Sequence, residues 1–346
     1  MGEVNSQHPT GVRRREPSME DVAREAGVSG QTVSRVVNDR GYVGAATREK
    51  VTAAMARLGY RPNSAARALR SGRFRTLGVI MFTLAPYGNH RTLDAIASRA
   101  TEAGYTLTLI PVDASNRATV NGAFSRLEEH AVDGIIILIE AHELDGSEIE
   151  IPPGMPIVVI DSNKRFGHPF VDIDQAQGAR TAVEHLLALG HETVHHVAGP
   201  PESYAAERRQ HAWRAVLEEH GLPVSEPQPG DWSARSGYEA GLRLAADPSV
   251  TAVFAANDAM AIGVLRAFHE QGIAVPAQVS VVGFDDVPDA AYLWPPLTTI
   301  RQSFDEVGRR AVDALIAELD GDEPIDQEFI ATELIVREST AKKPTR

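Results

Sequence analysis

The sequence predicts an α/β protein in which a small N-terminal helical head precedes a large core with parallel sheets. From residue 76 onward, apolar runs rich in Val and Ile alternate with helical stretches, as is typical of parallel sheets buried on both faces. This pattern continues for roughly 265 residues, more than a typical single doubly wound sheet holds, so two lobes are expected. The head differs in charge: residues 1–75 carry 14 Lys and Arg against 7 Asp and Glu, whereas the remaining residues carry 20 against 40.

The composition of the 346-residue chain narrows the class of protein. No apolar run approaches the ~20 residues that span a bilayer, and the polar start has no apolar segment of a secretory signal. We therefore expect a soluble cytoplasmic protein with no membrane partner. Without cysteines, neither a disulfide framework nor a thiolate metal site is expected. A basic head on an acidic body is expected when only one end of a chain meets phosphates, and a solvated basic tail is the alternative.

The head begins with the signals of two short helices. The first helix is expected to begin after Ser18, with acidic residues in its first turn, and to end at Gly27. Ser29 can cap the second helix, whose inward face carries Val33, Val36 and Val37. Its opposite face carries polar residues at helical spacing, namely Gln31, Ser34 and Arg35.

A third helix completes the head. Thr47 is expected to cap this helix and Gly59 to end it, with one apolar stripe facing the first two helices. Two helices joined by a turn that contains glycine form the helix-turn-helix unit, whose second helix lies in the major groove of DNA. The sequence therefore predicts double-stranded DNA as a partner.

A short segment links the head to the core. Asn63 is a good N-cap for a helix of about eight residues that runs to Gly72. So short a helix is marginal alone, and it is expected to form only against a partner.

Polar groups follow the ends of the expected core strands, which cover residues 76–82, 106–112, 134–139, 156–161, 193–199, 252–257 and 279–286. Ligands of such sheets bind beyond the carboxyl ends of the strands, where Asp161, Asn257 and Asp285 stand. Asp258 is expected mainly to cap the next helix, and caps are also the alternative for Asp161 and Asp285. Carboxylates and amides can each hold two sugar hydroxyls, and Trp232 in a Gly- and Ser-rich loop can cover the C–H face of a ring. These groups suit a sugar.

Signals of catalysis are missing from the sequence. It contains no dinucleotide-binding, P-loop, nucleophile-elbow or H-E-x-x-H motif. The pair His195 and His196 lies in an apolar strand run, which favours packing over metal binding. We therefore expect no enzyme, no cofactor and no metal.

Two stretches, MEDVAREAGVSGQTVSRVVN and TREKVTAAMARLGYRPNSAARALRSG, resemble the helix-turn-helix and hinge of the LacI/GalR family of bacterial transcription repressors. The resemblance continues in order from about Ser18 to Ser339. Within the core, GDWSARSG, AANDAMAIG and VSVVGFDDVPDAAYLWPPLTTIRQSF are especially similar to lactose-type members. The resemblance implies a two-lobed core like that of periplasmic sugar-binding proteins.

For the head, the resemblance implies base contacts by Gln31 and Arg35. It implies positions near phosphates or the groove wall for Thr32, Ser34 and Asn38, although Ser34 and Asn38 are equally compatible with an ordinary helix surface. Gly30 stands where many family members carry a larger side chain, often tyrosine, so one base preference is expected to be relaxed or taken over by neighbouring residues.

For the linking segment, the resemblance implies a hinge helix that begins at Asn63 and folds against its dimer mate in the minor groove. Leu69 would wedge between base steps and kink the duplex, and Ala66 would let the two helices approach closely. Packing of Leu69 on its own domain is the alternative.

For the core, the resemblance implies effector contacts by Asp161, Arg209, Trp232, Asn257, Asp285, Gln302 and Phe304. A galactoside is the first expectation. The run Leu138-Ile139-Glu140 departs from a lactose-type site, which would carry smaller or amide groups there. Bulky Phe82 and Tyr87 after the first strand favour a disaccharide or oligosaccharide, because they could stack on a second ring.

Several alternatives remain open. Arg209 could pair with Glu207 or Glu218 on the surface, and Phe304 is as compatible with the core as with a ligand wall. A non-sugar effector such as a purine is the alternative within the family. A sugar-binding protein without a regulatory role is the alternative outside it.

The expected domains are a disordered basic tail (1–16), the helix-turn-helix domain (17–62), the hinge (63–74), the core (75–340) and a second tail (341–346). The N-lobe is expected to cover about 75–173 plus 304–331, and the C-lobe about 174–300 plus 332–340. No leucine heptads follow FIATELIVREST, so we expect a homodimer whose two heads read a pseudo-palindromic operator. Sugar binding is expected to release the operator.

Overall fold

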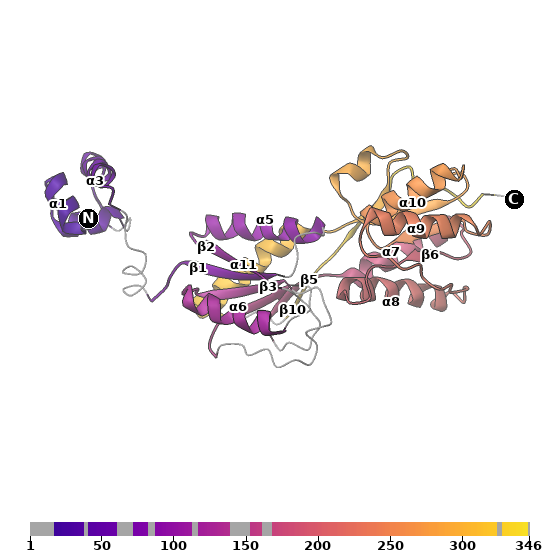
Figure 1. Cartoon of the computed structure of the whole chain (residues 1–346), viewed down its shortest axis with the longest axis horizontal. Helices are drawn as coiled ribbons and strands as arrows, with labels where there is room; N and C mark the ends of the chain where they lie inside the picture. Colours follow the sequence, from indigo (N-terminus) through magenta and orange to yellow (C-terminus); the bar gives the residue numbers. More distant parts are fainter. Residues whose placement is uncertain are drawn as a thin grey trace, which may run out of the picture. The chain divides into compact units, whose positions relative to one another are not determined.

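The computed structural model describes residues 17–37, 41–60, 72–81, 87–112, 117–138, 153–160, 168–323 and 327–344. It consists of two compact units that divide between Phe74 and Arg75 (Figure 1). No helix in the described ranges is long and apolar enough to cross a membrane.

The first unit holds three helices, α1 (Met19–Ala26), α2 (Gly30–Val37) and α3 (Ala45–Leu58). Ser18 and Asp21 form a reciprocal capping box before α1, and Gly27 ends this helix in the left-handed conformation. The apolar stripes of the three helices bury one another around Val22, Val33 and Val51, each 0% exposed. The predicted helix-turn-helix is confirmed.

The predicted cap of the third helix is wrong. α3 begins at Ala45 after Gly44, so Thr47 lies inside its first turn, where its N–H donates to the Gly44 carbonyl (2.9 Å). The two alanines before Thr47 extend the helix because alanine has the highest helix propensity.

The N-lobe of the second unit is built on a six-stranded parallel sheet of order β10-β5-β4-β3-β1-β2. The strands are β1 (Thr76–Met81), β2 (Thr106–Pro111), β3 (Gly134–Leu138), β4 (Ile157–Ile160), β5 (Phe170–Ile173) and β10 (Gln327–Ile330). Helices α5 (Tyr87–Glu102) and α11 (Phe304–Asp320) cover one face, and α6 (Arg117–Glu129) covers the other (Figure 1). Apolar residues on both faces are therefore buried, as the sequence pattern predicted.

The C-lobe is built on a five-stranded sheet of order β11-β9-β8-β7-β6. Its strands are β6 (His195–Val197), β7 (Ala252–Ala255), β8 (Ser280–Asp285), β9 (Thr298–Arg301) and β11 (Glu333–Ile335), and a short 3-10 helix, η3 (Pro288–Tyr292), follows β8. α7 (Gln175–Ala188) and α8 (Tyr204–Glu219) pack on one face, and α9 (Ala234–Ala245) and α10 (Asp258–Glu270) on the other. The sheet is parallel, as predicted, except at the edge strand β11, which runs antiparallel to β9.

The chain passes between the two sheets after β5, after β9 and after β10. Residues that follow β5 and β9 therefore stand at the junction of the lobes. The predicted fold class, a helical head before a two-lobed α/β core, is confirmed.

Candidate functional site

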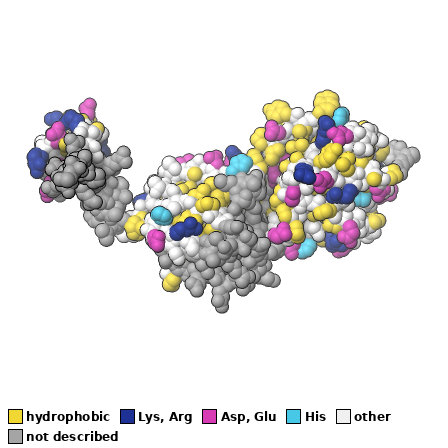
Figure 2. Space-filling view, viewed as in Figure 1, with side chains coloured by type: hydrophobic (Ala, Val, Ile, Leu, Met, Phe, Trp, Pro, Cys, Tyr) yellow, Lys and Arg dark blue, Asp and Glu magenta, His cyan; other side chains and the backbone are white. Residues whose placement is uncertain are grey.

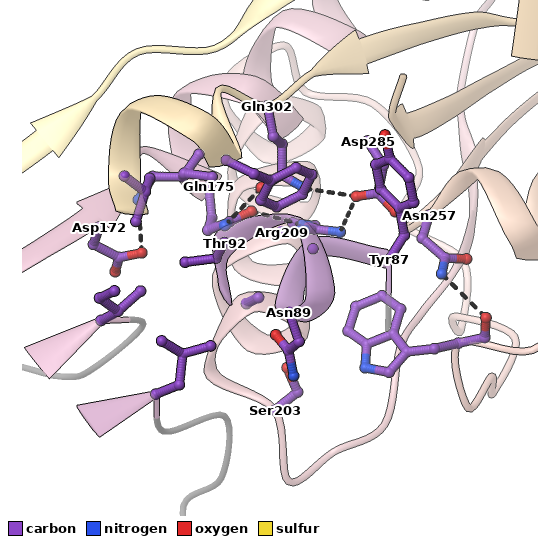
Figure 3. Close-up of a pocket in the computed structure, with 18 residues that line it drawn as sticks. Tyr87, Asn89, Thr92, Asp172, Gln175, Ser203, Arg209, Asn257, Asp285 and Gln302 are labelled. Atoms are coloured by element: carbon purple, nitrogen blue, oxygen red, sulfur yellow. Dashed lines mark hydrogen bonds and ion pairs between the residues drawn. The ribbon is translucent and has the colours of Figure 1, made fainter. Parts of the chain in front are cut away.

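A pocket lies between the two lobes (Figure 3), with a volume of about 710 Å³ that includes open solvent at its mouth. Its polar residues are Tyr87, Asn89, Thr92, Asp172, Gln175, Ser203, Arg209, Trp232, Asn257, Asp285 and Gln302. Its apolar wall includes Leu138, Ile160, Ile173, Phe304 and Val307. Six predicted effector residues, Arg209, Trp232, Asn257, Asp285, Gln302 and Phe304, all line this one pocket.

Four side chains of the pocket form a ring of three hydrogen bonds that is closed by one longer ion pair, which we call the Asp285 network: Asp285, Gln302, Gln175 and Arg209. Gln302 Nε2 donates to Asp285 Oδ1 (2.5 Å), and Gln175 Nε2 donates to Gln302 Oε1 (3.0 Å). Arg209 Nε donates to Gln175 Oε1 (2.8 Å), and its Nη1 lies 3.9 Å from Asp285 Oδ1. Each of the four side chains is less than 10% exposed, so the network presents oriented donors and acceptors in a dry environment.

Arg209 is held from several directions. It lies on α8, donates to the Ala256 carbonyl, and stacks its guanidinium 3.8 Å from the ring centre of Phe284. The same guanidinium lies 5.3 Å from the indole of Trp232. Arg209 is 4% exposed, so the alternative of a surface ion pair with Glu207 or Glu218 is wrong.

Asp285 occupies a strained backbone position at the end of β8. Its φ is 123° and that of Asp286 is 55°, values that L-residues rarely adopt. Asp286 holds this turn in place, because its carboxylate accepts from Arg301 Nε (2.8 Å) and Arg337 Nη2 (2.6 Å). Burial raises the pKa of Asp285 to about 6, although Arg209 and Gln302 act in the opposite direction.

Trp232 lies against the pocket rather than in open solvent. Its backbone is left-handed (φ 69°), and its carbonyl accepts from Asn257 Nδ2 (3.1 Å). The indole packs directly over Gly199, where any Cβ would overlap with the ring. The missing side chain at Gly199 therefore makes room for Trp232.

Asn257 rather than Asp258 caps α10, so the predicted cap is corrected. Asn257 Oδ1 accepts from the N–H of Met260 (2.8 Å). Asp258 is buried behind the pocket and accepts from the Val287 N–H (2.9 Å) and the Thr299 hydroxyl (2.5 Å). Burial, reinforced by the charge of Asp285, raises the pKa of Asp258 above its ordinary value.

The N-lobe side of the pocket is largely apolar. Phe304 lines the pocket and also packs against the N-lobe core, so both of its proposed settings hold. Tyr87 meets Phe304 edge to face, with ring centres 5.8 Å apart. Leu138, the last residue of β3, also lines the pocket, so the departure from a lactose-type site noted at this position faces the ligand space.

Five polar lining residues escaped the sequence analysis: Asn89, Thr92, Asp172, Gln175 and Ser203. Asn89 lies in the first turn of α5, Gln175 begins α7, and Ser203 caps α8. Asp172 lies within β5, where its carboxylate accepts from the Arg208 guanidinium of α8. The alternation of chain segments between lobes places these residues, and no local motif marks them.

The polar side chains predicted to face DNA differ in their exposure on α2. Gln31 and Arg35 are exposed on α2, while Ser34 is partly buried. Thr32 is involved in the helix start, since its N–H donates to Ser29 Oγ (3.2 Å). A Cβ at Gly30 would meet no atom within 4 Å, so the head has room there for a larger side chain. Figure 2 shows Lys and Arg gathered on the described surface of this unit, which also exposes Tyr42 (95%).

Five predicted site residues, Asn38, Asn63, Ala66, Leu69 and Asp161, lie outside the described residues, as do Phe82 and the tail 1–16. Of the histidine pair, His196 is buried between Trp213 and Phe254 and bonds the Phe254 carbonyl through Nδ1 (2.9 Å). Within the described ranges, no three His, Asp or Glu residues group in a way that could hold a metal ion.

Comparison with known proteins identifies the family. The model for "Bacterial regulatory proteins, lacI family" matches residues 18–63, and that for "Periplasmic binding protein-like domain" matches residues 183–340. The lactose operon repressor of Escherichia coli (strain K12) is 36% identical over 329 residues, 94% of this chain and 91% of that protein. The HTH-type transcriptional repressor PurR of Haemophilus influenzae (strain PittEE) is 30% identical over 331 residues, 93% and 98% of the two chains.

A crystal structure of the lac repressor dimer bound to operator and the anti-inducer ONPF is also similar, with a TM-score of 0.85 and 35% identity. The match covers 94% of this chain and 100% of that chain. The helix-turn-helix, the two-lobed core and these relatives lead to one conclusion: the chain belongs to the lacI family of bacterial regulatory proteins and is a DNA-binding transcriptional repressor.

Proposed function

We propose that this repressor controls carbohydrate-utilisation genes and leaves its operator when a neutral sugar binds between the lobes of its core. Gln31 and Arg35 would read base edges, and Thr32, Ser34 and Asn38 would contact phosphates or the groove wall. The hinge residues Asn63, Ala66 and Leu69 would enter the minor groove of a pseudo-palindromic operator held by a homodimer.

The Asp285 network is the observation that carries the sugar proposal. Its carboxylate, two amides and guanidinium lie within one ring of contacts, and each group can hold paired hydroxyls. The indole of Trp232 borders the same space and suits the C–H face of a sugar ring. Asn257 would add an amide, Phe304 an apolar wall, and Asp161 a further carboxylate.

Charge pairing in the pocket favours an uncharged ligand. Asp285 lies beside Arg209, and Asp172 pairs with Arg208, so each carboxylate of the described lining has its own guanidinium. An anionic or cationic ligand would have to displace one of these pairs from a buried position, which costs several kcal/mol by the usual penalty for unpaired buried charge. A neutral sugar can bind without displacing either pair.

A purine effector is the alternative, and the likeness to PurR is in keeping with it. Purines favour two parallel apolar faces, but Tyr87 and Phe304 meet at 75° in this pocket. Tyr87 also lines the pocket, where it could stack on a second ring or on an aglycone. A disaccharide or a galactoside with an extended aglycone is therefore the first effector to test.

Linkage explains how a sugar would act. A ligand that prefers the lobe arrangement in which the two hinges are apart weakens operator binding by its differential affinity. A coupling of about 1–3 kcal/mol corresponds to about 5–150-fold weaker operator binding. We therefore expect induction rather than co-repression.

A thermal-shift screen of mono- and disaccharides, with adenine and guanine included, tests the nature of the effector. We expect a sugar to stabilise the core and the purines to have no effect. Trp232→Ala should weaken binding of the best sugar at least tenfold because it removes the indole face, whereas Trp232→Phe should retain part of it. Both variants should bind operator as the wild type does. A wild-type core that binds a purine and no sugar would overturn the proposal.

Effector binding should depend on pH through Asp285. Its pKa of about 6 in the folded protein lies above its ordinary value near 3.8, so the carboxylate becomes protonated as pH falls through 6. A protonated carboxyl accepts fewer hydroxyl bonds, and sugar affinity should fall up to about tenfold per pH unit below that value. Isothermal titration between pH 5 and pH 8 measures this slope.

The stability of the core should follow the opposite trend for this group. The folded state binds more protons than the unfolded state between about pH 4 and pH 6, so the Asp285 contribution to the free energy of unfolding decreases as pH rises through that window.

The variant Asp285→Asn is the control for the pH dependence of sugar binding. It should bind sugar weakly, and its residual sugar affinity should not vary over the pH range of the isothermal titration. An equal pH slope in wild type and Asp285→Asn would show that another group titrates.

A further inference from the structure

The ion pair between Asp172 and Arg208 joins the two lobes beside the pocket. Asp172 on β5 of the N-lobe is 2% exposed, and its Oδ2 accepts from the Arg208 guanidinium on α8 of the C-lobe. Asp172 Oδ1 accepts from the N–H of Ile173 (2.7 Å). The carboxylate lines the pocket, while Arg208 lies in an adjoining groove beside Phe170 and Phe329.

The position of Asp172 is costly for a purely structural residue. Its strand neighbours Phe170, Val171 and Ile173 are all buried apolar residues. Burial removes the Asp172 carboxylate from water, while the side chain of Arg208 stays 25% exposed. Well-packed apolar residues in place of a buried ion pair are often as stable or more stable by about 1–4 kcal/mol. A charge that the fold alone does not favour, placed on the wall of a ligand pocket, indicates a role in binding.

We propose that Asp172 is a second effector-binding carboxylate, the N-lobe counterpart of Asp285, and that Arg208 is the positioning residue that holds it. This inference rests on the proposed sugar effector. Figure 3 shows Asp172 and Asp285 on opposite sides of the pair Gln175 and Arg209, so a ring between them would be held from both lobes. One edge of the sugar donates a hydroxyl to Asp285, and the opposite edge donates a hydroxyl to Asp172.

The arrangement defines the class of effector more closely. It selects neutral sugars that carry hydroxyls on two opposite edges of one ring, because a buried acceptor left without its donor is costly. It also ties binding to the lobe arrangement. Arg208 of the C-lobe donates to the Asp172 carboxylate of the N-lobe, so this ion pair depends on how the lobes meet. A sugar that bonds Asp172 would therefore bind with different affinity in different lobe arrangements.

Isothermal titration with the tightest-binding sugar of the screen and the complete set of its monodeoxy analogues tests the inference. Asp172→Asn keeps the side-chain volume and should weaken binding of the parent sugar at least tenfold. One analogue, which lacks the hydroxyl that reaches Asp172, should lose a similar factor on the wild type and no further affinity on Asp172→Asn. Arg208→Met should weaken binding too, and Asp172→Asn/Arg208→Met should bind no more weakly than Asp172→Asn alone.

The exposed pair Arg180 and Glu219, which joins α7 to α8 within the C-lobe (2.7 Å), supplies the matched control. Arg180→Met should leave sugar affinity unchanged, and thermal unfolding reports whether each variant is folded. The neutral double variant carries no unpaired buried charge, so it remains informative if Arg208→Met unfolds. If Asp172→Asn binds the parent sugar within twofold of wild type, or if every analogue loses the same factor, the role of Asp172 is overturned while the proposed sugar effector stands. A wild type that binds no sugar would overturn the proposed effector, and this inference with it.

Discussion

Arg209→Met should abolish the sugar response and leave operator binding in the absence of sugar unchanged. The guanidinium donates to Gln175 and to the Ala256 carbonyl, lies beside Asp285, and stacks on Phe284. Truncation of one partner of a buried, hydrogen-bonded charge pair costs about 2–5 kcal/mol, which corresponds to roughly 30–5,000-fold weaker sugar binding. The result would be a repressor that cannot be induced.

Sugar titration of the core and operator binding with and without sugar measure this effect. Arg209→Lys keeps the charge but loses the planar fork, so it should fold and still bind sugar much more weakly than the wild type. Arg235→Met removes an equivalent charge from an exposed pair with Glu239 on α9 and should behave as wild type. Sugar affinity of Arg209→Met within threefold of wild type would contradict the placement of the site.

Arg35→Ala should give the largest loss of operator affinity. Arg35 is exposed on α2 with no large neighbour at Gly30, and a bidentate contact from arginine to guanine is worth about 1–3 kcal/mol of discrimination. Both heads of a dimer lose this contact, so about 2–6 kcal/mol would be lost per operator, or roughly 30-fold to more than 10,000-fold.

The loss should be specific to the base read by Arg35. Measured against operators substituted at each position, Arg35→Ala should lose its preference at one symmetric base pair per half-site and keep the others. Arg266→Met removes the same charge from α10 in the core and should leave operator affinity unchanged. A uniform loss across all operator sequences would assign Arg35 to phosphate contact instead.

The head and the C-lobe could be predicted from the sequence because their signals are local. Ser18 and Gly27 mark the ends of α1 by backbone chemistry, and three inward valines orient α2. Asn257 and Asp285 follow apolar strands whose carboxyl ends meet at one edge, so their convergence follows from parallel topology.

The N-lobe side of the site could not be predicted because long-range contacts decide it. Asp172 interrupts the apolar pattern of β5, and its ion pair with Arg208, 36 positions along the chain, is a contact that no local signal predicts. Asn257 and Asp258 are equally good caps by sequence. The Thr299 hydroxyl on β9 donates to Asp258, which holds the Asp258 carboxylate away from the helix start, and Asn257 is the residue that caps α10. Gln175 enters the pocket because the chain changes lobes after β5, an event without a local signal.

Operator affinity with and without sugar, measured at one fixed salt concentration, tests the central claim most directly. Salt must be fixed because phosphate contacts make operator affinity strongly salt-dependent. We predict that the best-binding sugar weakens operator binding about 5–150-fold in the wild type and has no effect on Arg209→Met. Operator affinity that rises, or stays unchanged, with every sugar that binds the core would contradict the account.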